Sequence, residues 1–353
     1  SVRAVVEDYA DRECEDFDTL PVPSVWQAYG YDRHQYTNIR YPFPYDPPYL
    51  PLDNPCGIYR TEFSVSDLGS RYYLNFEGVD SCLYVWVNGS FVGYSEVSHS
   101  TSEFEITRFL AEENNTLTVL VLKWCSGSYL EDQDKLRMSG IFRDVYLLRR
   151  PQEHLRDLTV KTVLENNYTK GILNVAFEST SLLPANWTLL GPEGEKLDEG
   201  KVEGETGNFS AHVDSPALWN AEHPNLYTLL LHAGEEYIAQ KVGFREVKAE
   251  NGVLLVNGRP VTFRGVNRHD SDPVKGYAVD SEDLLRDLTI MREHNINAIR
   301  TSHYPCSPLM SEMCDRLGFY LIEEADIECH GVTTQSGDFK NYRADYPLIA
   351  RDP

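Results

Sequence analysis

Alternating apolar and polar residues run through the first part of the chain and predict short β-strands. The stretch "CLYVWVNGSFVGY" places Leu83, Val85 and Val87 on one face and then turns at an Asn-Gly pair, a strong hairpin signal. The runs "NTLTVLVLKW" and "IFRDVYLLRR" have the same character. Because little helical periodicity interrupts them, residues 57 to about 150 are predicted to form an antiparallel sandwich or jelly roll. An irregular segment rich in Pro and Tyr is expected to lie over it, so that the first domain spans residues 1–150.

A second group of strand-like runs occupies residues 151–248. It contains "DLTVKTVL", "GILNVAFEST", "NWTLLGPEG" and "LYTLLLHAG", which we expect to be separate short strands joined by turns. Their number and spacing predict an immunoglobulin-like sandwich.

The hydrophobic period changes in residues 249–353. After a hairpin, Leu284, Leu288 and Met291 recur on one face of a predicted helix that Asp280 is positioned to cap. A Ser-Pro pair opens a second predicted helix, and strand-like runs precede and follow each of the two. This β-α-β-α-β order predicts the beginning of a parallel sheet, as in a (β/α)8 barrel.

Composition narrows the classes of function. The chain has 41% apolar and 12% aromatic residues, enough for packed cores, and a formal charge of −23 that repels nucleic acid and anionic membranes. No apolar run approaches the roughly 18 residues of a membrane span. The seven cysteines are scattered without a CxxC pair, which is typical of reduced thiols, so we expect a cytoplasmic protein.

Polar side chains follow each predicted strand of the parallel sheet. "NRHD" follows the first strand, Arg300 and His303 follow the second, and a run of carboxylates with His330 follows the third. The carboxyl ends of parallel barrel strands share one rim, where active sites form. We therefore expect these groups, with Arg268 and His269 of the "NRHD" stretch, to converge there.

The residues alone leave the chemistry of this rim open. Glu328 and His330 could bind Mg²⁺ or Mn²⁺ together, or His330 could simply hydrogen-bond Glu328. Glu324 and Glu328 could instead form the acid and nucleophile pair of a glycoside hydrolase, although both come from one loop. Motifs for serine hydrolases, zincins and nucleotide binding are absent from the sequence.

Several segments together resemble glycoside hydrolase family 2. "FRGVNRHD", "NAIRTSHYP" and "IEEADIECHG" resemble its barrel strands, and "DNPCGIYR" and "GSYLEDQDKLRMSGIFRDV" are similar to segments of its bacterial β-galactosidases. The resemblance covers nearly the whole chain. It implies a sugar-binding jelly roll, an immunoglobulin-like sandwich and a barrel, in that order, and hydrolysis of terminal β-galactosides such as lactose. Within the family, a β-glucuronidase is the alternative.

The resemblance also implies which residues bind sugar. Asn54 and Asp134 match galactose-binding residues of the first domain, and the aspartate at Asp134 also helps to hold Na⁺. His269 and His303 match histidines that line the galactose pocket. From the residues alone, Asn54 could equally be a turn residue, and Asp134 could pair with Arg137.

The barrel residues receive roles in the same way. Arg300 matches an arginine that orients the nucleophilic carboxylate, although it could instead form a structural ion pair with Glu324. Glu328 and His330 match two ligands of Mg²⁺. No position matches either catalytic glutamate of the family, because both lie further on than Pro353.

We therefore expect an N-terminal portion of a retaining β-galactosidase that is inactive alone. Residues 249–353 supply fewer than half of the about 250 residues of a complete barrel. Two alternatives remain open: a non-catalytic galactoside-binding module, and a subunit completed by a separate C-terminal portion. The resemblance also implies that the complete protein is a homo-oligomer.

Overall fold

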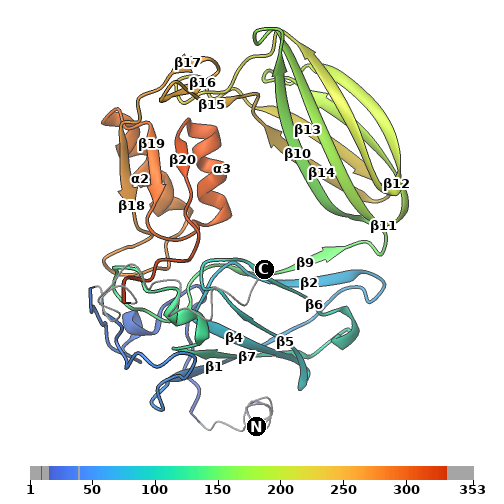
Figure 1. Cartoon of the computed structure of the whole chain (residues 1–353). Coiled ribbons are helices and arrows are strands. Elements are labelled where there is room, and N and C mark those ends of the chain that lie inside the picture. The colour runs from blue at the N-terminus through green and yellow to red at the C-terminus, as the bar shows by residue number, and fades with distance from the viewer. Residues whose placement is uncertain (1–8, 10–15, 39, 332–353) are drawn as a thin grey trace.

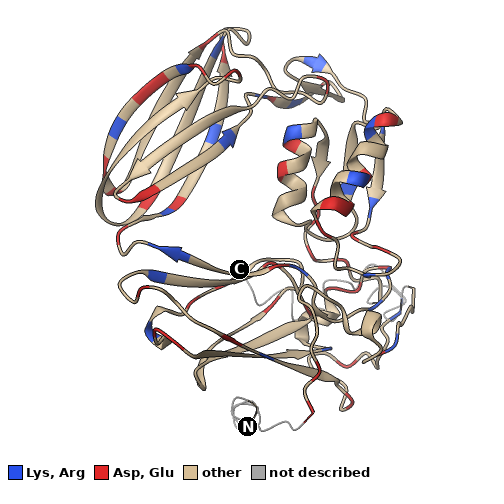
Figure 2. Cartoon of the chain, turned by 180° about the vertical axis from the view of Figure 1, so that it is seen from behind, with Lys and Arg blue, Asp and Glu red and all other residues tan. Residues whose placement is uncertain are grey.

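The computed structural model describes residues 9, 16–38 and 40–331, which form three parts (Figure 1). Two β-sandwiches are joined in sequence, and a small parallel sheet with two helices follows them. The parallel part contacts both sandwiches. Acidic residues are spread over all three parts (Figure 2).

The first part is a sandwich with short accessory elements. Its main sheet has the order β1-β7-β4-β5, its second sheet has the order β6-β2-β9, and β3 pairs with β8. The strands are β1 (Cys56–Phe63), β2 (Arg71–Phe76), β3 (Val79–Asp80), β4 (Cys82–Val87), β5 (Ser90–Glu96), β6 (Ser102–Glu105), β7 (Asn115–Leu122), β8 (Gly140–Ile141) and β9 (Val145–Arg150). The short 3-10 helices are η1 (Trp26–Tyr29), η2 (Thr107–Phe109) and η3 (Ser126–Tyr129).

The hairpin predicted in this part is present. Leu83, Val85 and Val87 lie in one core between the two sheets, as their spacing indicates. The turn between β4 and β5 has positive φ at both Asn88 and Gly89, which is the conformation that an Asn-Gly pair favours. Trp86 and Leu120 pack on the other face of the main sheet, so β4 is buried on both sides.

Residues 40–51 of the segment rich in Pro and Tyr form an irregular chain that packs against this sandwich. Tyr41 donates a hydrogen bond to the carbonyl oxygen of Tyr129 (2.6 Å), and the Tyr129 hydroxyl donates to the carbonyl oxygen of Tyr49 (2.7 Å). Cys329, from the other end of the described chain, packs in the same aromatic cluster. The segment is therefore fixed at the junction of the first and third parts.

The second part is a sandwich of five strands, with one difference from the sequence prediction. Its strands are β10 (Leu155–Glu165), β11 (Lys170–Leu190), β12 (Lys196–Asp214), β13 (Tyr227–Ala233) and β14 (Glu236–Val242). The runs "GILNVAFEST" and "NWTLLGPEG", expected to be separate strands, belong largely to the single strand β11. Its pairing with β12 is interrupted between Glu178 and Leu183, but Pro184 tolerates extended backbone and the chain does not turn.

The third part is the β-α-β-α-β unit that the sequence predicts. A three-stranded antiparallel sheet of β15 (Val247–Glu250), β16 (Val253–Val256) and β17 (Arg259–Pro260) leads into it. The unit consists of β18 (Gly265–Arg268), α2 (Ser281–Glu293), β19 (Ala298–Thr301), α3 (Pro308–Leu317) and β20 (Tyr320–Ile322). The three strands are parallel in the order β18-β19-β20.

Local signals explain where both helices begin and end. The Asp280 side chain accepts hydrogen bonds from two backbone N–H groups of the first turn of α2, and the Ser307 side chain caps α3 by accepting from the Met310 N–H. Gly318 ends α3 with a φ of 81°. Leu284 and Leu288 are buried against the sheet, so the predicted apolar face of α2 is confirmed.

Two further sequence expectations concern thiols and membranes. The cysteines within the described residues form no disulfide, in agreement with the scattered spacing, and Cys14 lies outside the described residues. Among the described residues, no helix is long and apolar enough to cross a membrane.

Candidate functional site

The ends of the three parallel strands meet at one rim, as expected. Asn267 and Arg300 are neighbours in the register of β18 and β19. The Arg300 guanidinium donates to Asn267 Oδ1 (3.4 Å) and, through Nε, to Glu324 Oε1 (2.6 Å). His303 Nδ1 lies 2.9 Å from Glu324 Oε2. Glu324, which follows β20, therefore holds two groups from the end of β19, and the anticipated ion pair with Arg300 is present.

His269 lies beside this group. Its ring centroid is 5.8 Å from that of His303, and its Nδ1 is 3.3 Å from the Tyr304 hydroxyl. Burial lowers the pKa of His269, and the charges of Lys135 and His303 lower it further. A neutral imidazole can accept a hydrogen bond at one nitrogen and donate one at the other, as binding of a sugar hydroxyl requires.

Arg268 does not join the rim, which corrects the sequence expectation. Its guanidinium forms ion pairs with Asp270 and with Asp287 of α2. Successive residues of a strand point to opposite faces, so Asn267 faces the rim while Arg268 faces the helices. The same alternation separates Arg300 from Ile299, which packs in the helix-covered core.

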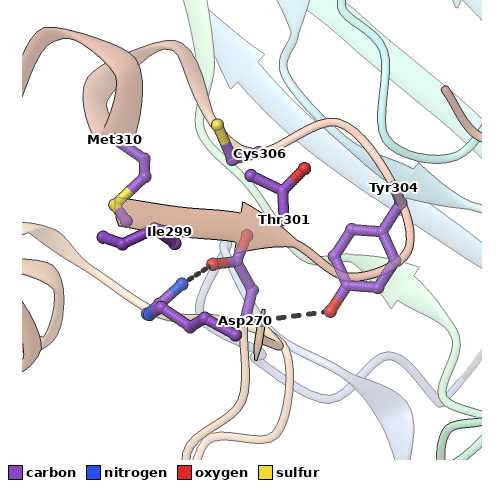
Figure 3. Close-up of a pocket in the computed structure, with 7 residues that line it drawn as sticks. Asp270, Ile299, Thr301, Tyr304, Cys306 and Met310 are labelled. Carbon is purple, nitrogen blue, oxygen red and sulfur yellow. Dashed lines mark hydrogen bonds and ion pairs between the residues drawn. The ribbon is translucent and has the colours of Figure 1, made fainter. Parts of the chain in front are cut away.

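A small cavity lies on this helix side of the sheet and is too small to hold a sugar. It has a volume of about 10 Å³. Figure 3 shows Ile299, Tyr304, Cys306 and Met310 lining it, with Asp270 beside them. This volume holds at most one water molecule.

Glu328 and His330 lie at the outer part of the rim. His330 Nε2 is 2.6 Å from Glu328 Oε1, so the hydrogen bond that the sequence left open is present. The other oxygen, Glu328 Oε2, is buried, has no hydrogen-bond partner among the described residues and lies 3.8 Å from His303 Nδ1. A buried carboxylate oxygen that lacks a donor is suited to a cation. Among residues 9, 16–38 and 40–331, however, no group of three or more His, Cys, Asp or Glu side chains could hold a metal.

The first domain contributes Asp134 near the rim. Its Oδ1 accepts a hydrogen bond from the Tyr36 hydroxyl (2.7 Å), and its charge acts on the pKa of His269, which it tends to raise. The alternative pairing of Asp134 with Arg137 is wrong, because Arg137 pairs with Asp132 instead. Asp134 therefore presents a carboxylate held by a neutral donor.

Asn54 is used differently. Its side-chain amide donates to the Trp124 carbonyl oxygen and accepts from the Trp124 N–H, both at 2.9 Å. These bonds reach a residue 70 positions away and fix the chain just before β1, so Asn54 has a structural contact that is not that of a turn residue. A role in sugar binding stays a prediction.

Sequence reasoning missed the residues that join the first domain to the rim. His99 and Asp326 form a buried pair with Nδ1 and Oδ2 2.8 Å apart, and Gln133 Nε2 donates to Asp326 Oδ1 (2.5 Å). Asp132 contacts the segment that carries Glu328. The "DQD" stretch could have indicated that Asp132 and Gln133 of the first domain make such contacts. No local pattern in a sequence, however, identifies partners that lie about 200 positions away.

Comparison with known proteins assigns the family. Models of the "Glycosyl hydrolases family 2" match the chain in three consecutive segments: the sugar-binding domain over residues 2–151, the central domain over 153–245 and the TIM-barrel domain over 247–353. Together the three segments account for nearly the whole chain, in the order that the fold shows. The chain belongs to glycosyl hydrolase family 2.

Relatives within family 2 are similar over most of this chain. A β-galactosidase of Actinobacillus pleuropneumoniae is 52% identical over 89% of the chain, and one of Staphylococcus xylosus is 46% identical over 95%. The matched regions are 31% and 33% of those proteins. The chain thus spans about a third of the length of these relatives.

Solved structures of family 2 share the fold. A β-glucuronidase from an uncultured Clostridium species superimposes with a TM-score of 0.78 at 22% identity, covering 92% of this chain and 56% of that one. The Bifidobacterium dentium β-glucuronidase bound to coumarin-3-O-glucuronide gives 0.79 at 19% identity, covering 91% and 58%. At these identities the likeness concerns the arrangement of the domains and not the substrate.

Proposed function

We propose that this chain is the N-terminal portion of a retaining β-galactosidase that hydrolyses terminal β-D-galactosides. The 52% identity to a β-galactosidase over 89% of the chain carries this proposal. The β-glucuronidase neighbours, at 19–22% identity, share only its fold. The complete enzyme is proposed to be a homo-oligomer.

In this function the rim binds the galactose unit. His269 and His303 offer imidazole nitrogens to sugar hydroxyls, and Asp134 offers a carboxylate from the first domain. Contacts that tighten as the sugar gains oxocarbenium character would raise kcat and not only affinity. Asn54 is proposed to support the same pocket through the chain segment that it fixes.

Arg300 and Glu324 are proposed to set the charge of the pocket. Arg300 Nε and His303 Nδ1 both engage Glu324, which makes this carboxylate a poor general acid or nucleophile. The arginine would then orient and keep ionised a catalytic carboxylate supplied by a later strand. This arrangement argues against Glu324 and Glu328 as the catalytic pair.

Two cations are proposed for the complete enzyme. Glu328 and His330 would contribute two ligands to Mg²⁺, and the buried Glu328 Oε2 without a donor supports that role. Mg²⁺ would supply positive charge that stabilises negative charge developing nearby. Asp134 is proposed as a ligand of Na⁺. With only two side-chain ligands in place, this chain alone should bind Mg²⁺ weakly.

A hybrid enzyme tests the substrate. The chain would replace the matched 31% of the A. pleuropneumoniae β-galactosidase, and the hybrid would be assayed with nitrophenyl β-galactoside and nitrophenyl β-glucuronide. We expect hydrolysis of the galactoside only. Preference for the glucuronide would overturn the proposal.

The chain by itself provides the second arm of this test. We expect no galactoside hydrolysis by residues 1–353, because no described carboxylate is arranged as an acid and nucleophile pair. Clear turnover by the pure chain would contradict the proposed division of roles. Activity on co-expression with the remaining two-thirds of the relative would favour a split enzyme.

A further inference from the structure

The segment 325–331, which we call the rim loop, is attached to the first domain by a series of hydrogen bonds. Just before it, the Glu324 N–H donates to Thr301 Oγ1 of the barrel part (3.1 Å). Within the loop, the Ile327 N–H donates to the Ala325 carbonyl oxygen (2.8 Å). The other bonds of the loop described below cross to the first domain.

Asp326 is the first of these attachments. Its Oδ2 accepts from His99 Nδ1 (2.8 Å) and from the His99 backbone N–H (3.2 Å), and its Oδ1 accepts from Gln133 (2.5 Å). The His99 and Asp326 side chains are each 2% exposed. A carboxylate buried to this degree is stable only with such donors, so the loop cannot leave His99 without a large cost.

Asp132 provides the second attachment, and its two bonds to the loop are to Glu328 and to Gly331, on either side of Cys329 and His330. Its backbone N–H donates to the Glu328 carbonyl oxygen (2.6 Å), and its Oδ2 accepts from the Gly331 N–H (2.8 Å). Asp132 is 0% exposed, and Arg137 forms an ion pair with its other carboxylate oxygen. The Asp132 side chain is therefore held within the first domain by a contact that does not involve the loop.

The packing around Gly331 shows how closely the loop fits. A Cβ atom at this position would collide with the Tyr41 ring and with Asp132 Oδ2. Tyr41 is itself held by its hydrogen bond to the Tyr129 carbonyl oxygen. Only glycine permits this approach between the loop and the first domain.

We propose that Asp132 is a positioning residue that, from the sugar-binding domain, sets the conformation of the rim loop and hence the placement of Glu328 and His330. Glu328 and His330 then take up their positions only when the first domain is docked against the rim loop. The hydrogen bonds described above support the docking itself. Its consequence for catalysis rests on the proposed function.

The thiol of Cys329 gives a direct measurement of this docking. It lies in the loop between Glu328 and His330, is 5% exposed and packs in the aromatic cluster with Tyr41 and Tyr129. The rate at which iodoacetamide alkylates it, followed by peptide mass spectrometry on the 353-residue chain, reports opening of the loop. The buried thiols of Cys82 and Cys314 report opening of the first domain and of the barrel part.

Two variants approach the contact from opposite sides. Asp132→Asn removes the charge from the first domain, and Gly331→Ala introduces the collision from the loop. Asp132→Asn should speed alkylation of Cys329 by about tenfold, the effect of losing one buried hydrogen bond. Gly331→Ala should speed it at least as much because of the collision, and Cys82 and Cys314 should be unchanged in both variants. Glu236→Gln is the control, since it removes a similarly paired carboxylate, bonded to Arg150, away from the loop.

The outcomes separate positioning from general stability. If all three thiols react faster in parallel, or if Cys329 is unchanged in both variants, the proposal is wrong. In the hybrid enzyme, Asp132→Asn should lower kcat more than it raises KM, and added Mg²⁺ should partly restore kcat. Because alkylation is measured without substrate, failure of the galactosidase assignment would leave that result intact.

Discussion

At the scale of single residues, His99 shows how the interface fixes a protonation state. Its Nδ1 donates to Asp326, and its Nε2 lies 3.1 Å from Lys135 Nζ, which can only donate. Both contacts are satisfied by a neutral imidazole. Burial and the ammonium of Lys135 accordingly lower the pKa of His99 to about 4.

This predicts a dependence of stability on pH. In the unfolded chain His99 takes up a proton near pH 6.5, but in the folded chain only near pH 4, so its contribution is complete above pH 6.5 and lost as the pH falls. Burial raises the pKa of Asp80 to about 6, so Asp80 stabilises the folded chain more as the pH falls. This opposes the effect of His99 over nearly the same pH range. The comparison must therefore be made against His99→Asn.

The measurement is the free energy of unfolding in urea at pH 7 and pH 4. The stability of the wild-type chain relative to His99→Asn should fall by about 3 kcal/mol between the two pH values. A difference that stays constant would show that folding does not lower the pKa of His99.

His303 leads to a prediction about activity in the hybrid enzyme. His303→Ala removes a proposed sugar contact and one partner of Glu324, so kcat/KM for a β-galactoside should fall by about 10- to 100-fold. His223→Ala, at an exposed position of the second sandwich, is the matched control. An unchanged kcat/KM would assign His303 a structural role only.

At this scale the sequence predicted most of the groups that gather at the rim and offered the local pairs among them, but it did not predict their contacts with the first domain. Polar residues after parallel strands are a local pattern, so His269, Arg300 and His303 could be found. Asp326 and His99 are 227 positions apart, and their pairing depends on how two domains dock. The direction of Arg268 was also missed, although the alternation of side chains along a strand could have predicted it.

At the scale of elements, capping signals were more informative than strand signals. Asp280, Ser307 and Gly318 mark helix ends because each satisfies backbone groups locally. The length of β11 depends on pairing with β12 and β13, which lie later in the chain. Two apolar runs separated by a proline therefore read as two strands when the structure has one.

Gly318 gives a test at this scale. Its φ of 81° is unfavourable for other residues, and a Cβ there would collide with the Ala221 carbonyl oxygen of the second part. Gly252 has a similar φ of 76° but has no atom within 4 Å of such a Cβ. Gly252→Ala should therefore cost about 1 kcal/mol and Gly318→Ala clearly more, about 3 kcal/mol. If both variants lost the same free energy of unfolding in urea, the chain near Ala221 would be able to move aside at little cost.

At the scale of the whole molecule, the barrel part is held from two sides. From the second sandwich, Trp219 Nε1 donates to the Asp315 carbonyl oxygen at the end of α3 (2.8 Å). From the first, Arg143 donates to the Pro305 carbonyl oxygen (2.8 Å) and to Asp270 Oδ2 (3.2 Å) of the barrel part. A further bond to the His99 carbonyl oxygen (2.9 Å) fixes the arginine within its own domain. A three-stranded parallel sheet has little core of its own, so these contacts should set much of its stability.

Replacing Arg143 by methionine tests this dependence. The Arg143 side chain lies at the interface and is 6% exposed. Arg143→Met keeps its approximate length but removes the donor to two carbonyl oxygens and to Asp270 Oδ2. Unsatisfied buried acceptors are costly, so the free energy of unfolding should fall by about 3 kcal/mol. Arg149→Met is the control, because Arg149 pairs with Asp67 at a surface where the two side chains are 53% and 40% exposed, and it should cost less than about 1 kcal/mol. If urea unfolding gave equal losses for the two variants, the interface with the first domain would not be what supports the barrel part.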